Sequence, residues 1–274
     1  MENVASEPPH VAAAPPRVSL LAVFAHPDDE SLACGGLLAW CAAIGVKASL
    51  LCLTRGEGGP GAESGPANRA AELDAAARIL GLADVTLLEH PDGMLPWVDA
   101  GLVEADIAAA LDRLRPDVVV TFGEDGLYWH PDHIAVHERT TAAVAAAEAR
   151  GGAAPALYYV TMPIGSMRAV VTRALEKAAG VVPPPAPPQY ILGIDNVDAF
   201  GADAEPPTLV LDVRPFAARK LQAIRCHESQ LTDCALTWID EAEAPALLGV
   251  EQFRRARTGA PGESFLDRLG QSPA

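Results

Sequence analysis

Short apolar runs alternate with helix-forming segments along the first 160 residues. The first run, residues 18–24, is unbroken and typical of a strand buried on both faces of a parallel sheet, and similar runs recur along the chain. These runs cover residues 18–24, 46–53, 84–88, 117–122, 156–161 and 208–213. Helix formers fill the segments 31–44, 66–80, 102–114 and 131–149. The alternation predicts an α/β fold class: a Rossmann-like, doubly wound, mostly parallel sheet with helices on both faces.

The two ends of the chain are less regular. Residues 1–16 are broken by prolines and predict a disordered tail, which leaves residues 17–274 as a single domain. The stretch VVPPPAPPQY, residues 181–190, predicts a polyproline-like connector, because proline lacks the amide donor. It is either a loop near a site or a surface insertion without a role. Helices are expected over residues 218–229 and again across 242–257.

Composition narrows the class of partner. Twenty Lys and Arg against 36 Asp and Glu give a net charge of −16, so we expect no nucleic acid partner. No stretch approaches the roughly 18 apolar residues of a membrane span, so no membrane association is expected. The five cysteines lack C-x-x-C spacing and favour a reduced, cytoplasmic setting. GEGGPG, residues 56–61, lacks a P-loop lysine, which argues against ATP. A small-molecule substrate fits these limits, and a homo-oligomer is allowed.

Two histidine motifs follow the first and fourth expected strands. They are AHPDDE, residues 25–30, and GLYWHPDH, residues 126–133. In a sheet of order 3-2-1-4-5 these strands are neighbours, and their carboxyl ends border the binding crevice. A buried run of histidine and acids costs several kcal/mol unless the charges are paired or bind a cation. A lone histidine most often caps a helix or fills the core, but two such motifs on adjacent strands favour a catalytic zinc site.

The two motifs in this order resemble the LmbE-like or PIG-L family of zinc-dependent N-acetylglucosaminyl deacetylases. The resemblance extends to TRGEGG (54–59), NRAAELDAAARILG (68–81), DGM (92–94) and, weakly, KLQAIRCHESQ (220–230). It implies a metal-dependent hydrolase that removes the acetyl group from an N-acetylglucosamine-type sugar conjugate. In that mechanism zinc-bound water attacks the amide carbonyl. The implied partner is a small-molecule amino-sugar substrate.

The resemblance also implies roles for individual residues. His26, Asp29 and His133 resemble the zinc ligands, and Asp28 resembles the general base. Fe²⁺ could replace Zn²⁺ in the cell, because affinity order alone does not decide occupancy. His130 and Tyr128 resemble the groups that stabilise the oxyanion. Asp132 would hold the His130 imidazolium and raise its pKa.

Other polar residues carry weaker expectations. Glu57, Arg69 and Asp92 are candidates to hold sugar hydroxyls, although Arg69 could equally serve only to pair with Glu72. His137 lies four residues after His133, as in an H-x-x-x-H pair, but we favour a place on the helix surface or beside the ligands. Glu30 is expected to stabilise the N-terminus of its helix, where acidic side chains are favourable. His227 and Gln230 match the weak C-terminal signature, for which a structural role is expected.

Two alternatives to deacetylation remain open at this point. One is an amidase that cleaves a bulkier amide in thiol S-conjugates with the same metal chemistry. The other is a non-catalytic sugar- or metal-binding module, since a fold alone does not set function. The presence of both Asp28 and His130 speaks against the module, because binding needs no general base.

Overall fold

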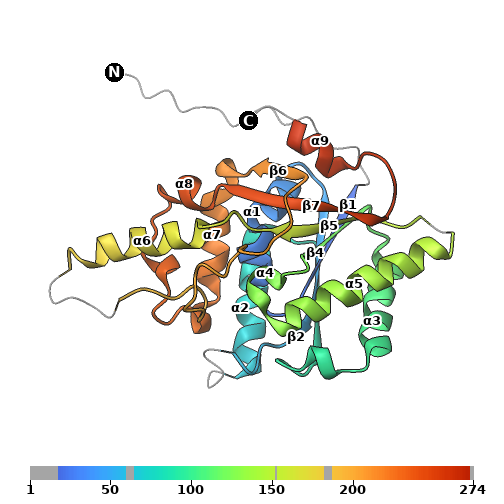
Figure 1. Ribbon diagram of the computed structural model, residues 1–274, viewed down its shortest axis with the longest axis horizontal. Helices are drawn as coiled ribbons and strands as arrows, with labels where there is room; N and C mark the ends of the chain where they lie inside the picture. The colour runs from blue at the N-terminus through green and yellow to red at the C-terminus, as the bar shows by residue number, and fades with distance from the viewer. Residues whose placement is uncertain (1–17, 60–64, 152, 182–186, 272–274) are drawn as a thin grey trace.

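The computed structural model of the protein describes residues 18–59, 65–151, 153–181 and 187–271. Among these residues seven strands form one sheet of order β3-β2-β1-β4-β5-β7-β6 (Figure 1). Strands β1 to β5 run parallel, while β7 is antiparallel to both β5 and β6. The strands are β1 (Ser19–Phe24), β2 (Lys47–Thr54), β3 (Asp84–His90), β4 (Val118–Phe122), β5 (Ala156–Thr161), β6 (Leu209–Asp212) and β7 (Val250–Gly259). The expected α/β class and the order 3-2-1-4-5 are confirmed.

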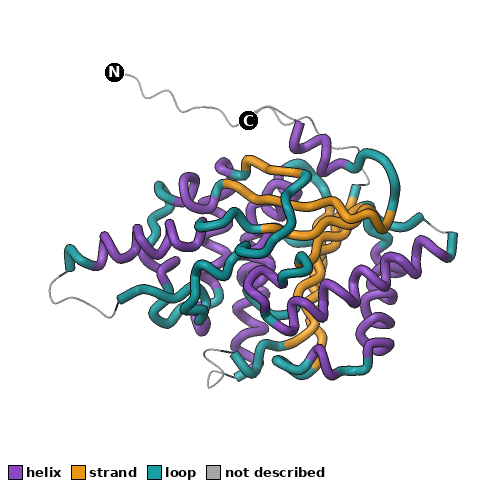
Figure 2. Tube along the Cα trace, in the orientation of Figure 1, coloured by secondary structure: helices purple, strands orange, loops and turns teal. Residues whose placement is uncertain are grey.

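Helices cover both faces of this sheet. Helices α1, α2 and α7 pack together on one face, and α3 packs with α5 on the other (Figures 1 and 2). The longer helices are α1 (Asp29–Ala43), α2 (Pro66–Leu80), α3 (Ala100–Leu114), α5 (Pro131–Ala149), α6 (Ser166–Ala178), α7 (Ala217–Cys226) and α9 (Phe265–Gln271). Short helical turns are η2 (Leu95–Trp97), α4 (Gly126–Trp129), η3 (Arg214–Phe216), η4 (Glu228–Gln230), η5 (Ala235–Trp238) and α8 (Ala244–Leu248).

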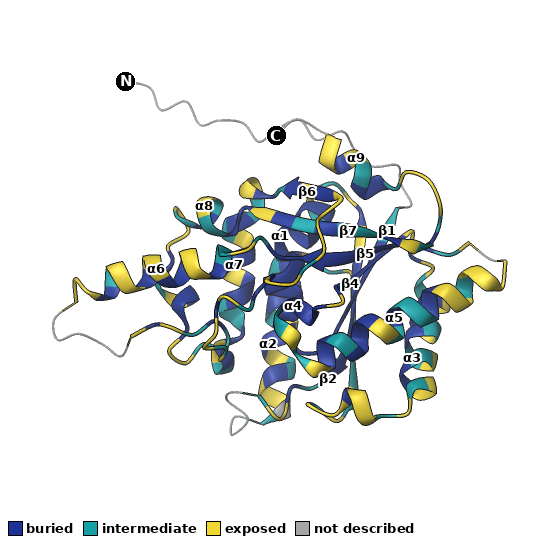
Figure 3. Ribbon diagram, in the orientation of Figure 1, coloured by how far each residue is buried: buried dark blue, intermediate teal, exposed yellow. Residues whose placement is uncertain are grey.

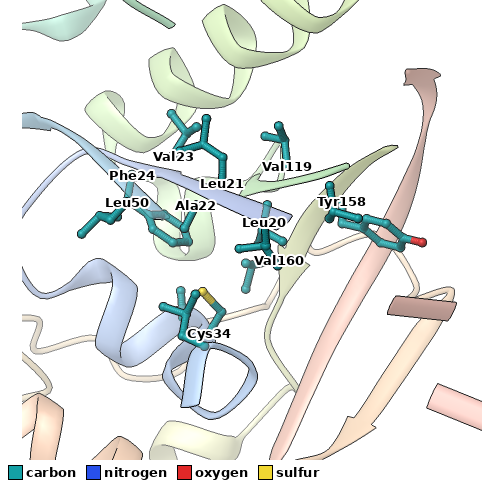
Figure 4. Packing of buried hydrophobic residues seen from close by; sticks show 14 of the residues in the cluster. Leu20, Leu21, Ala22, Val23, Phe24, Cys34, Leu50, Val119, Tyr158 and Val160 are labelled. Carbon is teal, nitrogen blue, oxygen red and sulfur yellow. The ribbon is translucent and has the colours of Figure 1, made fainter. Parts of the chain in front are cut away.

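Strand β1 lies at the centre of the apolar core. Its residues from Leu20 to Phe24 are at most 1% exposed, because strands flank it on both sides and helices cover both faces. Leu21 and Val23 lie on one face, and Leu20 and Ala22 lie on the other, where Cys34 of α1 approaches (Figure 4). The sheet is accordingly buried throughout the centre of the molecule, and exposed residues gather on the outer helix surfaces (Figure 3). A rigid strand therefore leads directly into the AHPDDE motif.

The expected helix across 242–257 is wrong. The segment is a short turn, α8, followed by β7, which pairs with β5 on one side and β6 on the other. In register with β5, Arg254 and Arg255 lie over the rings of Tyr159 and Tyr158, at 5.0 and 4.8 Å from the ring centroids. Cross-strand contacts of this kind outweigh the helical preference of arginine, glutamine and glutamate.

Helix α6 was not expected from the sequence. Its residues Met167, Val170, Val171 and Ala174 are buried at helical spacing. They belong to a second apolar cluster that also takes in Leu32 of α1 and residues of α7, α8 and η5. This cluster lies beside the first motif and supports one wall of the site described below.

Some expectations concern segments outside this description. The expected tail, residues 1–16, lies outside the described residues, as do residues 182–186 of the proline-rich segment.

The five cysteines are all free. None of the described helices is long and apolar enough to cross a bilayer.

A buried ion pair joins the last strand to α7 and α1. Lys220 Nζ lies 2.7 Å from Glu251 Oε1, with side chains 5% and 2% exposed. The Glu251 carboxylate also accepts hydrogen bonds from the backbone N–H groups of Gly36 and Leu37, both at 2.8 Å. These N–H groups follow the non-helical residue Cys34 (φ −146°, ψ 24°), so Glu251 caps the second segment of α1 from a distant strand.

We expect Lys220→Met to lower the free energy of unfolding by about 3–5 kcal/mol, because it leaves the Glu251 carboxylate buried without its cation. Urea unfolding followed by far-UV circular dichroism measures the change. The double variant with Glu251→Gln should recover part of this loss, since no buried charge is then left. A loss below about 1 kcal/mol would instead be typical of an exposed pair.

Candidate metal centre

The loops after β1 and β4 bring the three expected ligands together. His26 Nδ1 lies 3.2 Å from His133 Nε2, and His133 Nε2 lies 3.2 Å from Asp29 Oδ1. His26 Nδ1 is 3.4 Å from Asp29 Oδ2. These separations match ligands placed about 2.0–2.2 Å from one tetrahedral ion.

The second nitrogen of each imidazole has its own acceptor. His133 Nδ1 donates to the carbonyl oxygen of Gly126 at 3.0 Å. His26 Nε2 lies 2.9 Å from Asp92 Oδ1 and 3.2 Å from Asp132 Oδ2. When these nitrogens carry the ring protons, His26 Nδ1 and His133 Nε2 present lone pairs to a common point beside Asp29, called the metal point below. Two lone pairs 3.2 Å apart repel unless a proton or a metal ion lies between them, and a metal ion bound by both nitrogens would take the place of that proton, so the donor set fits a metal ion.

Carboxylates give this point a strongly negative field. Burial lowers the pKa of His26, but hydrogen bonds to Asp132, Asp29 and Asp92 outweigh it and hold that pKa well above its usual value. Burial raises the pKa of Asp29, but His133 and His26 outweigh it and hold that pKa far below its usual range. Asp29 therefore stays ionised, as a metal ligand must be.

Asp28 differs from its neighbour Asp29. It occupies the N-cap position of α1, yet its side chain makes no capping hydrogen bond. Burial raises the pKa of Asp28 to about 7, with Arg69 opposing the shift and Asp29 adding to it. Adjacent carboxyl groups with opposite pKa shifts are the pattern that separates a ligand from a general base.

The expected partnership between Asp132 and His130 is wrong. The Asp132 carboxylate accepts hydrogen bonds from the N–H groups of Gly93 (2.7 Å) and Leu95 (3.0 Å) and contacts His26. Burial, together with the nearby His133 and His26, lowers the pKa of His130 to about 4. His130 Nδ1 accepts from the backbone N–H of Asp132, so the neutral ring carries its proton on Nε2.

Tyr128 is a second donor beside the ligands. Its ring centroid lies 5.2 Å from that of His133 and 5.9 Å from that of His130. Burial raises the pKa of Tyr128 well above its usual value, so its hydroxyl keeps its proton. Tyr128 and His130 can therefore both donate a hydrogen bond near the metal point.

The backbone that carries the second motif needs glycine at one position. Gly126 has φ 54°, and a Cβ there would lie 3.0 Å from the Cβ of His133. The same residue supplies the carbonyl that fixes the His133 ring. Gly126 is thus a functional position that motif reading missed, although its place at the start of GLYWHPDH was a signal.

Of the three residues expected to hold sugar hydroxyls, two line the cavity and one does not. Asp92 and Arg69 line the cavity over the metal point, where Asp92 Oδ1 contacts His26 and Arg69 Nη2 contacts Asp28. Arg69 Nη2 lies 3.2 Å from Asp28 Oδ2, so it pairs with Asp28. Glu57 is exposed, is not among the residues that line this cavity, and accepts from the N–H of Asp92. It supports the Asp92 loop.

His137 is a core histidine. It is 8% exposed, and its Nδ1 donates to the carbonyl oxygen of Phe122 at 2.9 Å. Its ring lies 4.5 Å from that of Tyr159 on β5. The expected place on the helix surface is therefore wrong, and the contacts to Phe122 and Tyr159 support neither the expected place beside the ligands nor an H-x-x-x-H pair with His133.

The cavity over the metal point has a volume of about 240 Å³, and both charged and apolar side chains line it. The charged ones, Asp28, Arg69 and Asp92, are called the polar wall below. The apolar ones include Leu192, Ile194 and Phe200, from the segment between α6 and β6. The cavity therefore offers both charged and apolar contacts to a substrate.

The sequence of this chain is similar to that of known deacetylases. The family model described as GlcNAc-PI de-N-acetylase (PIG-L) matches residues 21–144, which include every residue of the donor set. A 1D-myo-inositol 2-acetamido-2-deoxy-alpha-D-glucopyranoside deacetylase from Mycolicibacterium smegmatis is 35% identical over 241 residues, covering 78% of this chain and 80% of the relative. The chain belongs to the PIG-L family. It is an N-deacetylase, and the predicted enzyme class is confirmed.

Solved structures agree with the fold of this PIG-L protein. A conserved protein from Thermus thermophilus has a TM-score of 0.61 and 25% identity, covering 89% of this chain and 97% of that protein. The N,N'-diacetylchitobiose deacetylase from Pyrococcus horikoshii has a TM-score of 0.55 and 21% identity, covering 87% and 83%. The sheet and its helices are therefore the shared scaffold on which the donor set is built.

Proposed function

We propose that the protein removes the acetyl group from an N-acetylglucosamine joined to a small polyol such as inositol. The observation that carries the proposal is the pair of adjacent carboxyl groups, Asp29 in the donor set and Asp28 beside it with a pKa of about 7. The curated relative quoted above is named for an inositol-linked substrate. A cavity of about 240 Å³ is smaller than the roughly 300–1,000 Å³ of drug-sized ligand sites, which favours a short conjugate of one amino sugar over a polymer.

Zn²⁺ is the metal we propose, with Fe²⁺ as the second candidate in the cell. His26, Asp29 and His133 would hold it, and nitrogen and carboxylate donors of this kind suit both ions. When bound, the metal would polarise the amide carbonyl and lower the pKa of coordinated water. Three protein ligands would leave one position of a tetrahedral ion for water or substrate.

The side chains around the donor set have complementary roles in this proposal. Asp28 takes a proton from the attacking water and later gives it to the amide nitrogen as the C–N bond breaks. The N–H of His130 and the hydroxyl of Tyr128 donate to the carbonyl oxygen as it becomes negative. The products are acetate and a free amine. Arg69 and Asp92 remain candidates for contact with sugar hydroxyls at the polar wall.

The proposal also covers the extent of the catalytic domain, its compartment and its oligomeric state. We take residues 17–274 as one catalytic unit, because a single sheet carries both motifs and the C-terminal segments. The free cysteines, four of them buried, favour a reducing compartment such as the cytoplasm. A homo-oligomer stays a prediction from the sequence.

Release of free amine by the zinc-loaded full chain tests the proposal. The panel contains the inositol-linked N-acetylglucosaminide, free N-acetylglucosamine, N,N'-diacetylchitobiose and an amide of a thiol S-conjugate, each with a chelated sample. We expect the highest kcat/KM on the inositol-linked sugar. Best activity on the S-conjugate would favour the amidase alternative, and stoichiometric zinc without any turnover would favour the binding module.

A further inference from the structure

The backbone of Asp28 is held in a strained conformation. Its φ of 132° and ψ of −28° lie in a region that residues other than glycine rarely adopt. Such strain costs on the order of 1–3 kcal/mol and persists only where the surroundings fix it. The contacts of Asp28 therefore show what keeps this carboxyl group in place.

Two side chains contact the strained residue from different helices. The Asp28 N–H donates to Glu30 Oε2 at 3.1 Å, within the first turn of α1. Arg69 Nη2 of α2 donates to the carbonyl oxygen of Pro27 at 2.6 Å and to Asp28 Oδ2 at 3.2 Å. Glu30 thus fixes the Asp28 backbone, and Arg69 fixes the carboxylate and the preceding peptide.

His227 holds the first of these supports. Its Nε2 lies 2.9 Å from Glu30 Oε1, and the two side chains are 1% and 0% exposed. Ser31 Oγ also donates to Glu30 Oε1, at 2.6 Å. Among the described residues, the other ring nitrogen of His227, Nδ1, is buried and has no hydrogen-bond partner. The polar contacts of this buried ring are therefore directed at Glu30 and the neighbouring Ser31.

The residue two positions further holds the second support. Ser229 donates to Glu72 through its backbone N–H at 2.8 Å and through its hydroxyl at 2.7 Å. Glu72 lies on α2 three residues after Arg69, so this contact fixes the helix that carries the guanidinium. One short segment, residues 227–229, thus holds both α1 and α2 where they meet Asp28.

We infer that His227 is a positioning residue for the catalytic base: through Glu30 it maintains the strained backbone that presents the Asp28 carboxylate beside the metal donors. The inference deepens the proposed function and rests on Asp28 acting as the base. His227 does not contact substrate in this scheme. It acts through Glu30, 197 positions away in the sequence.

Kinetics of two His227 variants test the inference in the zinc-loaded full chain. His227→Ala is expected to lower kcat about 10–100-fold, the cost of a small misplacement of a catalytic group, with KM and zinc content unchanged. His227→Gln keeps an N–H donor for Glu30 and should restore kcat to within about threefold of the wild type. Lys220→Met is the matched control, since it breaks a buried ion pair on α7, the helix that ends directly before His227, and this pair does not touch Asp28.

The outcomes separate positioning from stability. A fall in kcat for His227→Ala that Lys220→Met does not share supports the inference. An unchanged kcat in His227→Ala, a folded His227→Gln without recovery, or an equal fall in Lys220→Met would overturn it.

A crystal structure of His227→Ala tests the inference without any measurement of turnover. Its result therefore does not depend on whether the proposed function is correct. We expect Asp28 to leave its positive φ in that variant, and an unmoved Asp28 would contradict the role of His227. Absence of turnover in the wild type would count against the proposed function alone.

Discussion

Replacing Asp28 by asparagine is expected to lower kcat for deacetylation by about 10²–10⁴-fold, the usual contribution of a general base. Asparagine has the same shape, tolerates positive φ better than most residues and cannot accept the proton. Amine release under saturating substrate measures the change. Zinc content should stay at the wild-type value, because Asp28 is not one of the three proposed ligands, His26, Asp29 and His133.

The same variant should be as stable as the wild type or more stable. Burial raises the pKa of Asp28 to about 7, so the fold disfavours the ionised carboxylate that catalysis needs. A neutral amide removes that cost. A lower Tm in Asp28→Asn, or kcat within about threefold of the wild type, would count against a buried general base.

Removal of a metal ligand is expected to abolish both metal binding and activity. In His133→Ala the bound zinc should fall from about one ion per chain to near zero, since a three-ligand site loses an imidazole. Amine release should fall to the level of the chelated wild type. Metal analysis after dialysis gives a readout that does not depend on turnover.

His137→Gln is the matched control on the same helix. His137 is buried like His133, but its ring bonds to the Phe122 carbonyl, and glutamine can make the same donation. We expect this variant to keep its zinc and its activity. Loss of zinc in His137→Gln would instead indicate the H-x-x-x-H arrangement, and retention of zinc in His133→Ala would show that His133 is not a ligand.

The parallel half of the fold and the donor set were predictable from the sequence. Short, mainly apolar runs such as residues 18–24 and 117–122 are typical of buried parallel strands. The predicted strand order brings residues 25–30 and 126–133 to one crevice. The ligand atoms of His26, Asp29 and His133 meet there as expected. Their chemistry depends on local sequence and strand order, which both leave a clear pattern.

The missed features depend on contacts between distant residues. The segment 250–259 contains good helix formers, and only its position between β5 and β6 makes it a strand. Asp132 lies two residues from His130, yet the turn after β3 takes up its carboxylate through two backbone N–H groups. His227 gives no local sign of its contact with Glu30, because nothing in the intervening chain encodes that approach.

The position of β7 constrains the order in which the chain can fold. Strand β6 is synthesised before β7, yet among the described strands it pairs only with β7. Strand β6 therefore has no partner in the sheet until residues 250–259 leave the ribosome, although β1 to β5 can pair earlier. Glu251 arrives with that strand and brings the cap for α1 and the partner for Lys220. A chain truncated before residue 250 would expose the edge of β5, which makes incomplete chains prone to aggregation during translation.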